Sequence, residues 1–252
     1  MKKGWFIVIT LCGFIFLSNT ALAQTHRDTL RVLFVGNSYT YFENMPQMAS
    51  EISEMTGTKL ITEKITLGGA KLSEHWQGER GLKTREKIHS GDFDIVVLQE
   101  WSLGTVSEKD SAMKYLALFS DYVRKEGAEP FYYLTWAREK VPQLQETISS
   151  VYRDAAEQND ATVVPVGEAW AIARRLRPDF RLFNLDGTHP SGFGAYLTAC
   201  VFVAAITGEL PAVLPTYIGI QDRKGESVIL MMIDQLDADF CRAVALEAVG
   251  NK

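Results

Sequence analysis

Short apolar runs alternate with longer segments of helical spacing along most of the chain. The runs that read as strands are 30–35, 60–67, 94–98, 130–135 and 162–166. The segments with helical spacing are 44–55, 79–89, 108–125, 142–158, 168–175, 190–207 and 226–249. The run 94–98 (DIVVL) is continuously apolar, which is typical of a parallel strand covered on both faces. The alternation predicts an α/β protein with a parallel sheet and helices on both faces.

The N-terminus has the pattern of an export signal. Lys2 and Lys3 precede an apolar run over 5–16, and the small residues of 21–23 (ALA) offer a cleavage site before Gln24. The alternative, a membrane anchor, is disfavoured because a spanning helix needs about 20 apolar residues. We therefore predict a cleaved signal peptide at 1–23, export to the periplasm or the medium, and no stable membrane insertion. Residues 24–252 are predicted to form one domain, with 209–252 as a C-terminal helical extension.

Composition and charge narrow the class of protein. The chain has 252 residues, of which 46% are hydrophobic and 23% charged, and its net charge is −5. This composition is that of a globular protein and excludes a disordered chain. Without residues 1–23, two of which are lysines, 229 residues with a net charge of −7 remain. No basic surplus exists to neutralise phosphates, so we expect no nucleic-acid partner.

The cysteines and histidines do not form a metal-binding motif. Beyond the leader only Cys200 and Cys241 remain, both in apolar helical segments. Export permits a disulfide between them, but two buried free thiols fit the pattern equally well. CxxC and HExxH motifs are absent from the sequence. We expect no metal ion and no other cofactor.

Polar and small residues gather where the predicted strands end, which is where parallel sheets bind ligands. Ser38 follows the first strand in a turn of small residues and can act as a nucleophile. A serine hydroxyl needs a base, and His189 is the best candidate of the four histidines. Asp186, three residues earlier, can fold back onto the imidazole and orient it. Pro190 suits the first position of the next helix, which would place His189 at a helix start, where the dipole disfavours the charged imidazole.

These segments resemble the SGNH (GDSL-type) hydrolases. Residues 36–38 (GNS) match the first block of that family, with Asn37 where Asp is usual; Gly69 matches the glycine of the second block, and Asp186 and His189 match the last. Segments 68–76, 97–102, 134–137 and 185–189 resemble more narrowly the bacterial DUF4886 branch.

The resemblance covers about 31–208 and implies a three-layer α/β/α fold with a five-stranded parallel sheet. It implies Ser38 as nucleophile, His189 as base and Asp186 as orienting acid. The oxyanion hole would use the backbone N–H groups of Ser38 and Gly69 and a side-chain amide from the third block.

The third block departs from the family pattern. Residues 98–102 (LQEWS) replace the usual Gly-x-Asn-Asp. We expect Gln99 to supply the missing amide N–H, because the loss of one oxyanion donor costs about 3–4 kcal/mol of transition-state stabilisation; the alternative is weak activity. Glu100 is either a substrate contact or simply a loop charge.

Aromatic residues in the loops suggest a wall that binds substrate. Trp76, Trp101 and Trp136 would offer faces for sugar rings, with His75 and Asn37 as polar contacts. The alternative for His75 and the tryptophans is ordinary packing.

Three functions are compatible with these features. The first is an exported serine esterase that removes O-acyl groups, acetyl above all, from a small molecule or glycan. The second is a carbohydrate-binding protein that keeps the fold without the chemistry. The third is a thioesterase or lysophospholipase that acts on lipid.

Overall fold

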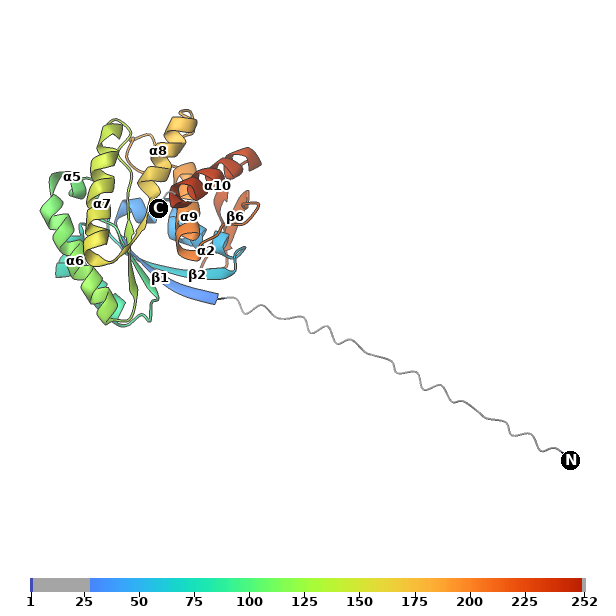
Figure 1. Ribbon diagram of the computed structural model, residues 1–252, viewed down its shortest axis with the longest axis horizontal. Helices are drawn as coiled ribbons and strands as arrows, with labels where there is room; N and C mark the ends of the chain where they lie inside the picture. The colour runs from blue at the N-terminus through green and yellow to red at the C-terminus, as the bar shows by residue number, and fades with distance from the viewer. Residues whose placement is uncertain (2–27, 251–252) are drawn as a thin grey trace.

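The computed structural model describes Met1 and residues 28–250 (Figure 1). The predicted signal peptide at 1–23, Met1 apart, lies outside the described residues. Within the described part, no helix has both the length and the apolar character needed to cross a bilayer.

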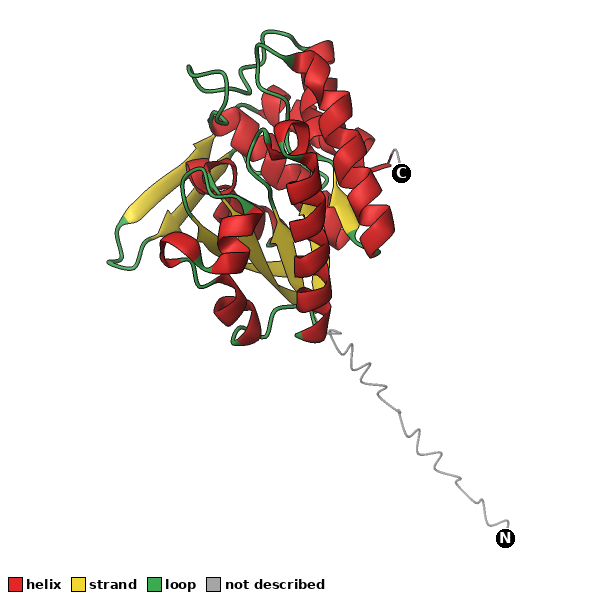
Figure 2. Ribbon diagram, turned by 90° about the vertical axis from the view of Figure 1, so that its left-hand side faces the viewer, coloured by secondary structure: helices red, strands yellow, loops and turns green. Residues whose placement is uncertain are grey.

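Five parallel strands form the central sheet (Figure 2). They are β1 (Asp28–Gly36), β2 (Thr58–Thr66), β3 (Ile95–Leu98), β4 (Glu129–Tyr133) and β5 (Thr162–Val164). Their order is β2-β1-β3-β4-β5, so the chain changes direction across the sheet at β1. Loops that leave the carboxyl ends of β1 and β3 diverge at such a point and open a crevice. The predicted α/β fold with a five-stranded parallel sheet is confirmed.

Two hydrophobic cores fill the two faces of the sheet, because successive side chains of a strand point to opposite faces. In β1, Val32 and Phe34 belong to one core and Leu33 and Val35 to the other. The helices that pack on the first core are α2 (Met45–Ser53), α8 (Val166–Leu176), α9 (Gly192–Thr207) and α10 (Gln235–Gly250). Those on the opposite side are α3 (Leu72–Gln77), α4 (Thr84–His89), α6 (Lys109–Lys125) and α7 (Gln145–Asn159). Short elements complete the chain: α1 (Ser38–Tyr41), η1 (Phe42–Asn44), η2 (Glu79–Gly81), α5 (Gly104–Ser107) and η3 (Pro142–Leu144).

The C-terminal segment contains a hairpin that the sequence pattern did not predict. Strands β6 (Tyr217–Gln221) and β7 (Ser227–Met232) pair antiparallel, so the expectation of helix from residue 226 is wrong for the first part of that segment. The run SVILMM is β-branched and apolar, which favours a strand. Helix α10 then packs on α9 and covers it (Figure 1). This explains why α9 is apolar all round: the sheet buries one side and α10 the other.

The two cysteines lie on these packed helices. Cys200 of α9 and Cys241 of α10 are free, buried thiols. Burial raises the pKa of both, so they stay protonated and act as small apolar side chains.

Candidate active site

The turn after β1 presents Ser38 and is fixed by its neighbours. The Asn37 side chain accepts from the Tyr39 backbone N–H (3.1 Å) and donates to the Ala70 carbonyl (3.0 Å). This caps the short helix α1, which begins at Ser38. Asn37 therefore ties the Ser38 turn to the loop after β2.

Gln99 supports the same turn from inside the protein. Its Oε1 accepts from the Asn37 backbone N–H (2.9 Å) and from the Thr40 hydroxyl (3.0 Å), and its amide donates to the Glu100 carbonyl. A Cβ on Gly36 would lie 2.4 Å from Gln99 Oε1, so only glycine allows this approach. The prediction that the Gln99 amide faces the oxyanion is wrong in this structure. The Asn37 N–H needs an acceptor, so the amide oxygen must face the turn, and the side chain is fully buried.

Ser38, His189 and Asp186 form one hydrogen-bonded chain. His189 Nε2 lies 2.8 Å from Ser38 Oγ, and His189 Nδ1 lies 2.5 Å from Asp186 Oδ2. The other Asp186 oxygen accepts from the backbone N–H groups of Thr188 (2.9 Å) and His189 (3.0 Å). Partial burial opposes ionisation of Asp186, but the hydrogen bonds from His189 and Thr188 outweigh it and lower the pKa of the carboxyl. The sequence pattern thus brought together three residues that stand up to 151 positions apart.

The helix that follows His189 begins later than predicted. Ser191 is the N-cap of α9, and its hydroxyl accepts from the Gly194 N–H at 3.1 Å. Pro190 instead pairs with Phe183 in an isolated β-bridge. His189 therefore stands outside the first turn, where the helix dipole has little effect.

Aromatic rings hold the His189 imidazole in place. Phe42 stacks on it with ring centroids 4.3 Å apart, and Tyr39 meets it edge-on at 5.9 Å. Trp136 stacks on Tyr39 at 4.5 Å and on Trp170 at 3.8 Å, and its Nε1 donates to the Thr188 carbonyl (3.0 Å). Trp136 is buried, so its predicted role in substrate binding is wrong. It supports the loop that carries His189.

A cavity of about 230 Å³ opens beside Ser38. The residues that line it are Asn37, Ser38, Tyr39, Gly69, Trp101, Ser102, Arg138, Thr188 and His189. We call it the Ser38 cavity. Among the described residues, no acceptor pairs with the backbone N–H of Ser38 or of Gly69. Gly69 adopts a φ of +68°, in the left-handed region that favours glycine. Of the predicted aromatic wall, Trp101 alone lies here.

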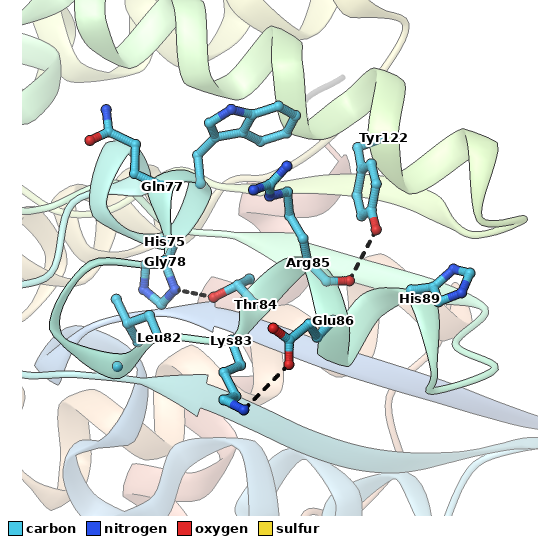
Figure 3. A pocket seen from close by; sticks show the side chains of 12 residues that line it. His75, Gln77, Gly78, Leu82, Lys83, Thr84, Arg85, Glu86, His89 and Tyr122 are labelled. Carbon is cyan, nitrogen blue, oxygen red and sulfur yellow. Dashed lines mark hydrogen bonds and ion pairs between the residues drawn. The ribbon is translucent and has the colours of Figure 1, made fainter.

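His75 and Trp76 lie elsewhere, beside a larger cavity of about 480 Å³ formed by α3, α4 and α6 (Figure 3). His75 Nδ1 bonds the Thr84 hydroxyl at 2.7 Å and Nε2 bonds the Gly36 carbonyl at 3.0 Å. Burial lowers its pKa to about 4. Trp76 packs edge-on against Phe119 and carries the Arg85 guanidinium on its ring at 5.1 Å. Their predicted contact with substrate in the Ser38 cavity is wrong, and packing is the correct alternative.

Glu100 is neither a substrate contact nor a solvated charge. It is 3% exposed, and its Oε1 accepts from the backbone N–H groups of Trp101 (2.7 Å) and Leu72 (3.3 Å). Burial raises its pKa to about 7. The expected contact with substrate is wrong: this loop carboxyl joins the end of β3 to the start of α3.

Four residues of the site escaped the sequence analysis: Tyr39, Phe42, Ser102 and Arg138. Arg138 follows β4, at the same sheet edge as the other site residues, and this position was a usable signal. Phe42 offered none, because it reaches His189 through a backbone bend in which Glu43 and Asn44 have φ values of 52° and 50°.

Comparison with known proteins shows which solved structures this chain resembles. No family model and no curated protein matches the chain. Among solved structures, a candidate SGNH hydrolase from Slackia heliotrinireducens is 26% identical with a TM-score of 0.60, over 71% of this chain and 100% of that one. A DUF4886 family protein from Bacteroides uniformis is 21% identical with a TM-score of 0.72, over 89% of this chain and 96% of that one. The acetyl xylan esterase AlAXEase is 16% identical with a TM-score of 0.55, over 70% and 100%. The chain therefore shares the fold of the SGNH hydrolases, the DUF4886 branch included, and the similarity supports an SGNH-type ester hydrolase.

Proposed function

We propose that the protein is an exported serine esterase that removes short O-acyl groups, acetyl above all, from carbohydrate. The observation that carries the proposal is the hydrogen-bonded chain from Ser38 through His189 to Asp186, next to two backbone N–H groups without an acceptor. A nucleophile, a base, an orienting acid and oxyanion donors are the parts that acyl transfer needs.

The proposed reaction has two halves. Ser38 Oγ attacks the acyl carbonyl carbon while His189 Nε2 takes its proton, and the backbone N–H groups of Ser38 and Gly69 stabilise the oxyanion. The C–O bond to the alcohol breaks as His189 returns the proton to the leaving oxygen, and an acyl-serine remains. Water, deprotonated by His189, then attacks the acyl-serine; the bond between the acyl carbon and Ser38 Oγ breaks, His189 returns the proton to Oγ, and the carboxylic acid leaves. Asp186 stays ionised, because its hydrogen bonds favour the carboxylate.

The size of the cavity supports a short acyl group. About 230 Å³ accommodates an acetyl group and part of its alcohol, whereas a long acyl chain needs a continuous apolar channel. This favours acetyl esters over the lipid-directed alternative. Trp101 lines the cavity, where its ring can pack against a sugar, and the fold resembles that of an acetyl xylan esterase. Both observations support a carbohydrate as the alcohol part of the ester. Export rests on the pattern of residues 1–23.

Hydrolysis of 4-nitrophenyl acetate by purified protein tests the proposal. Ser38→Ala should lower kcat/KM by at least about 10³-fold, and a fluorophosphonate should label the parent protein only. Equal rates for both proteins would contradict an esterase. Binding of acetylated sugars without turnover and without label would support the carbohydrate-binding alternative instead.

A further inference from the structure

The Ser38 cavity contains an unpaired positive charge. Arg138, in the loop after β4, is its only permanently charged lining residue among the described residues. Among the described residues, no carboxylate lies within 4.0 Å of its guanidinium. Arginines elsewhere in the fold do have acidic partners, as Arg153 has in Glu168 at 2.6 Å. The charge of Arg138 is thus available to a molecule in the cavity.

The groups around Arg138 are donors that lack an acceptor. Its Nη2 donates to Ser102 Oγ at 2.8 Å, so the Ser102 hydroxyl keeps its own hydrogen to donate. Arg138 Nε is buried without a partner. The Tyr39 hydroxyl is also buried; no partner meets it in good hydrogen-bond geometry, and Ser102 and Arg138 are its polar neighbours. Buried donors without an acceptor are unfavourable, and a single oxyanion can accept from several of them.

The acidic side chains nearest the cavity are already engaged. Asp186 accepts hydrogen bonds from His189 and from two backbone N–H groups. Glu100 accepts from two backbone N–H groups behind Trp101. Lys71, whose ammonium lies 5.1 Å from the Trp101 ring centre, is paired with Glu108 at 2.6 Å. Among residues 28–250, no carboxylate therefore forms an ion pair with Arg138.

We infer that the ester hydrolysed at Ser38 carries a carboxylate near the scissile bond, and that Arg138 and Ser102 bind it. The inference rests on the proposed esterase function and adds a substrate class to it. Arginine suits this task because its planar donors match the geometry of a carboxylate. The carboxylate belongs either to the acyl group, as in a dicarboxylic acid monoester, or to the alcohol, as in an acylated uronic acid. Ser38 and Arg138 share one cavity of about 230 Å³, so only a few bonds separate the ester from the charge.

Two matched pairs of esters test the inference and separate the two sources. The acyl-side pair is mono-4-nitrophenyl succinate against 4-nitrophenyl butyrate. The alcohol-side pair is a 2-O-acetyl methyl glucuronide against the corresponding methyl glucoside. We expect kcat/KM for the charged member of one pair to exceed that of its neutral partner at least about tenfold. Arg138→Gln should abolish this ratio, and Arg138→Lys should retain part of it.

Arg223→Gln is the matched control. Arg223 is exposed in the turn between β6 and β7, and its loss removes the same unit of charge from the protein, so the ratio should persist. Equal kcat/KM values within both pairs would overturn the inference, and so would an Arg138→Gln variant that slows the charged and neutral esters equally. If Arg138→Gln fails to fold, the inference is still tested by the parent protein, in which the charged ester of one pair must have the higher kcat/KM.

Failure of the proposed function has a different signature. In that case no ester is hydrolysed and fluorophosphonate leaves Ser38 unmodified. The charge preference is then measured as binding, by calorimetry with succinate and glucuronate against butanol and glucose. Arg138→Gln should weaken binding of the acid at least about tenfold, and equal binding of acid and neutral compound would overturn the inference.

Discussion

Two histidines form hydrogen bonds to the turn that carries Ser38, and only one of them can act as the base. His75 bonds the Gly36 carbonyl behind the nucleophile, and His189 bonds the Ser38 hydroxyl in front of it. The second nitrogen of His75 meets the Thr84 hydroxyl, whereas that of His189 meets the Asp186 carboxylate. His75 is also buried, and its pKa is lowered to about 4. Two hydrogen bonds are therefore not enough to make a histidine a base; an acidic partner and an open cavity are also required.

The strongest way to sharpen this contrast is to remove each imidazole in turn. His189→Ala should lower kcat/KM for 4-nitrophenyl acetate by about 10³-fold or more, because no other group can take the Ser38 proton. Its unfolding midpoint should change little, since the side chain is partly exposed. Steady-state kinetics and urea unfolding measure both. A His75→Ala variant as impaired per folded molecule as His189→Ala would break the contrast.

The acidic partner gives the second-largest expected effect. Asp186→Asn keeps the shape but offers an amide in place of the carboxylate, so the tautomer and the charge on His189 are no longer favoured. We expect kcat to fall about 10²- to 10⁴-fold with circular dichroism unchanged.

Substitution of Gln99 tests whether this residue supports the Ser38 turn or acts directly in catalysis. In Gln99→Leu the Asn37 N–H and the Thr40 hydroxyl lose their acceptor. We expect the free energy of unfolding to drop by about 1–3 kcal/mol, with the loss of activity following the loss of fixed Ser38 geometry. Urea unfolding and kinetics on the same samples measure both. A variant of full stability whose kcat is reduced about 10²- to 10³-fold would instead indicate a direct oxyanion donor.

Protonation of His75 should make stability depend on pH in a defined window. Its folded pKa of about 4 lies below the usual value of about 6.5, so the unfolded chain binds the proton more readily. Neutral His75 contributes up to about 3 kcal/mol to the free energy of unfolding. This contribution is complete above about pH 6.5 and is lost as the pH falls toward 4. Unfolding midpoints of the parent protein and of His75→Gln, measured from pH 7 to 4, should converge at low pH. Parallel curves would contradict this account.

Glu100 gives the opposite sign and the smallest expected effect. Its pKa is raised to about 7, above the usual value of about 4.3. The protonated form of Glu100 contributes to the free energy of unfolding; this contribution is complete below about pH 4 and is lost as the pH rises toward 7. Glu100→Gln keeps a side-chain oxygen for the Trp101 N–H, so it should gain stability relative to the parent protein at pH 8. Thermal unfolding at pH 5 and 8 measures the difference, and an equal offset at both pH values would refute the buried-acid interpretation.

The sequence predicted the sheet and the Ser38–His189–Asp186 cluster because both depend on local signals. Strand runs are marked by continuous apolar residues, and the site residues follow the carboxyl ends of strands. Neighbouring strands β1 and β3 place their loops together, which brings Gln99 to the turn that carries Ser38.

What the sequence could not predict is side-chain direction and packing. The amide oxygen of Gln99 faces the turn after β1 because the Asn37 backbone N–H needs an acceptor. This contact joins loops that are distant in the sequence, so the sequence pattern does not reveal it. Glu100 and Trp136 follow strands, as the site residues do, yet both are buried. Glu100 lies against the start of α3, and Trp136 stacks on Trp170. The hairpin β6–β7 was missed because its apolar run continues into α10 with only a short break.

Mass spectrometry after fluorophosphonate treatment tests the central claim most directly. Two serines, Ser38 and Ser102, line the cavity, and only Ser38 is bonded to His189. The account predicts a single modified peptide, at Ser38, in the parent protein and in Ser102→Ala. It predicts no modification in His189→Ala. Modification at Ser102, or an unmodified protein under conditions that label a known serine esterase, would contradict it.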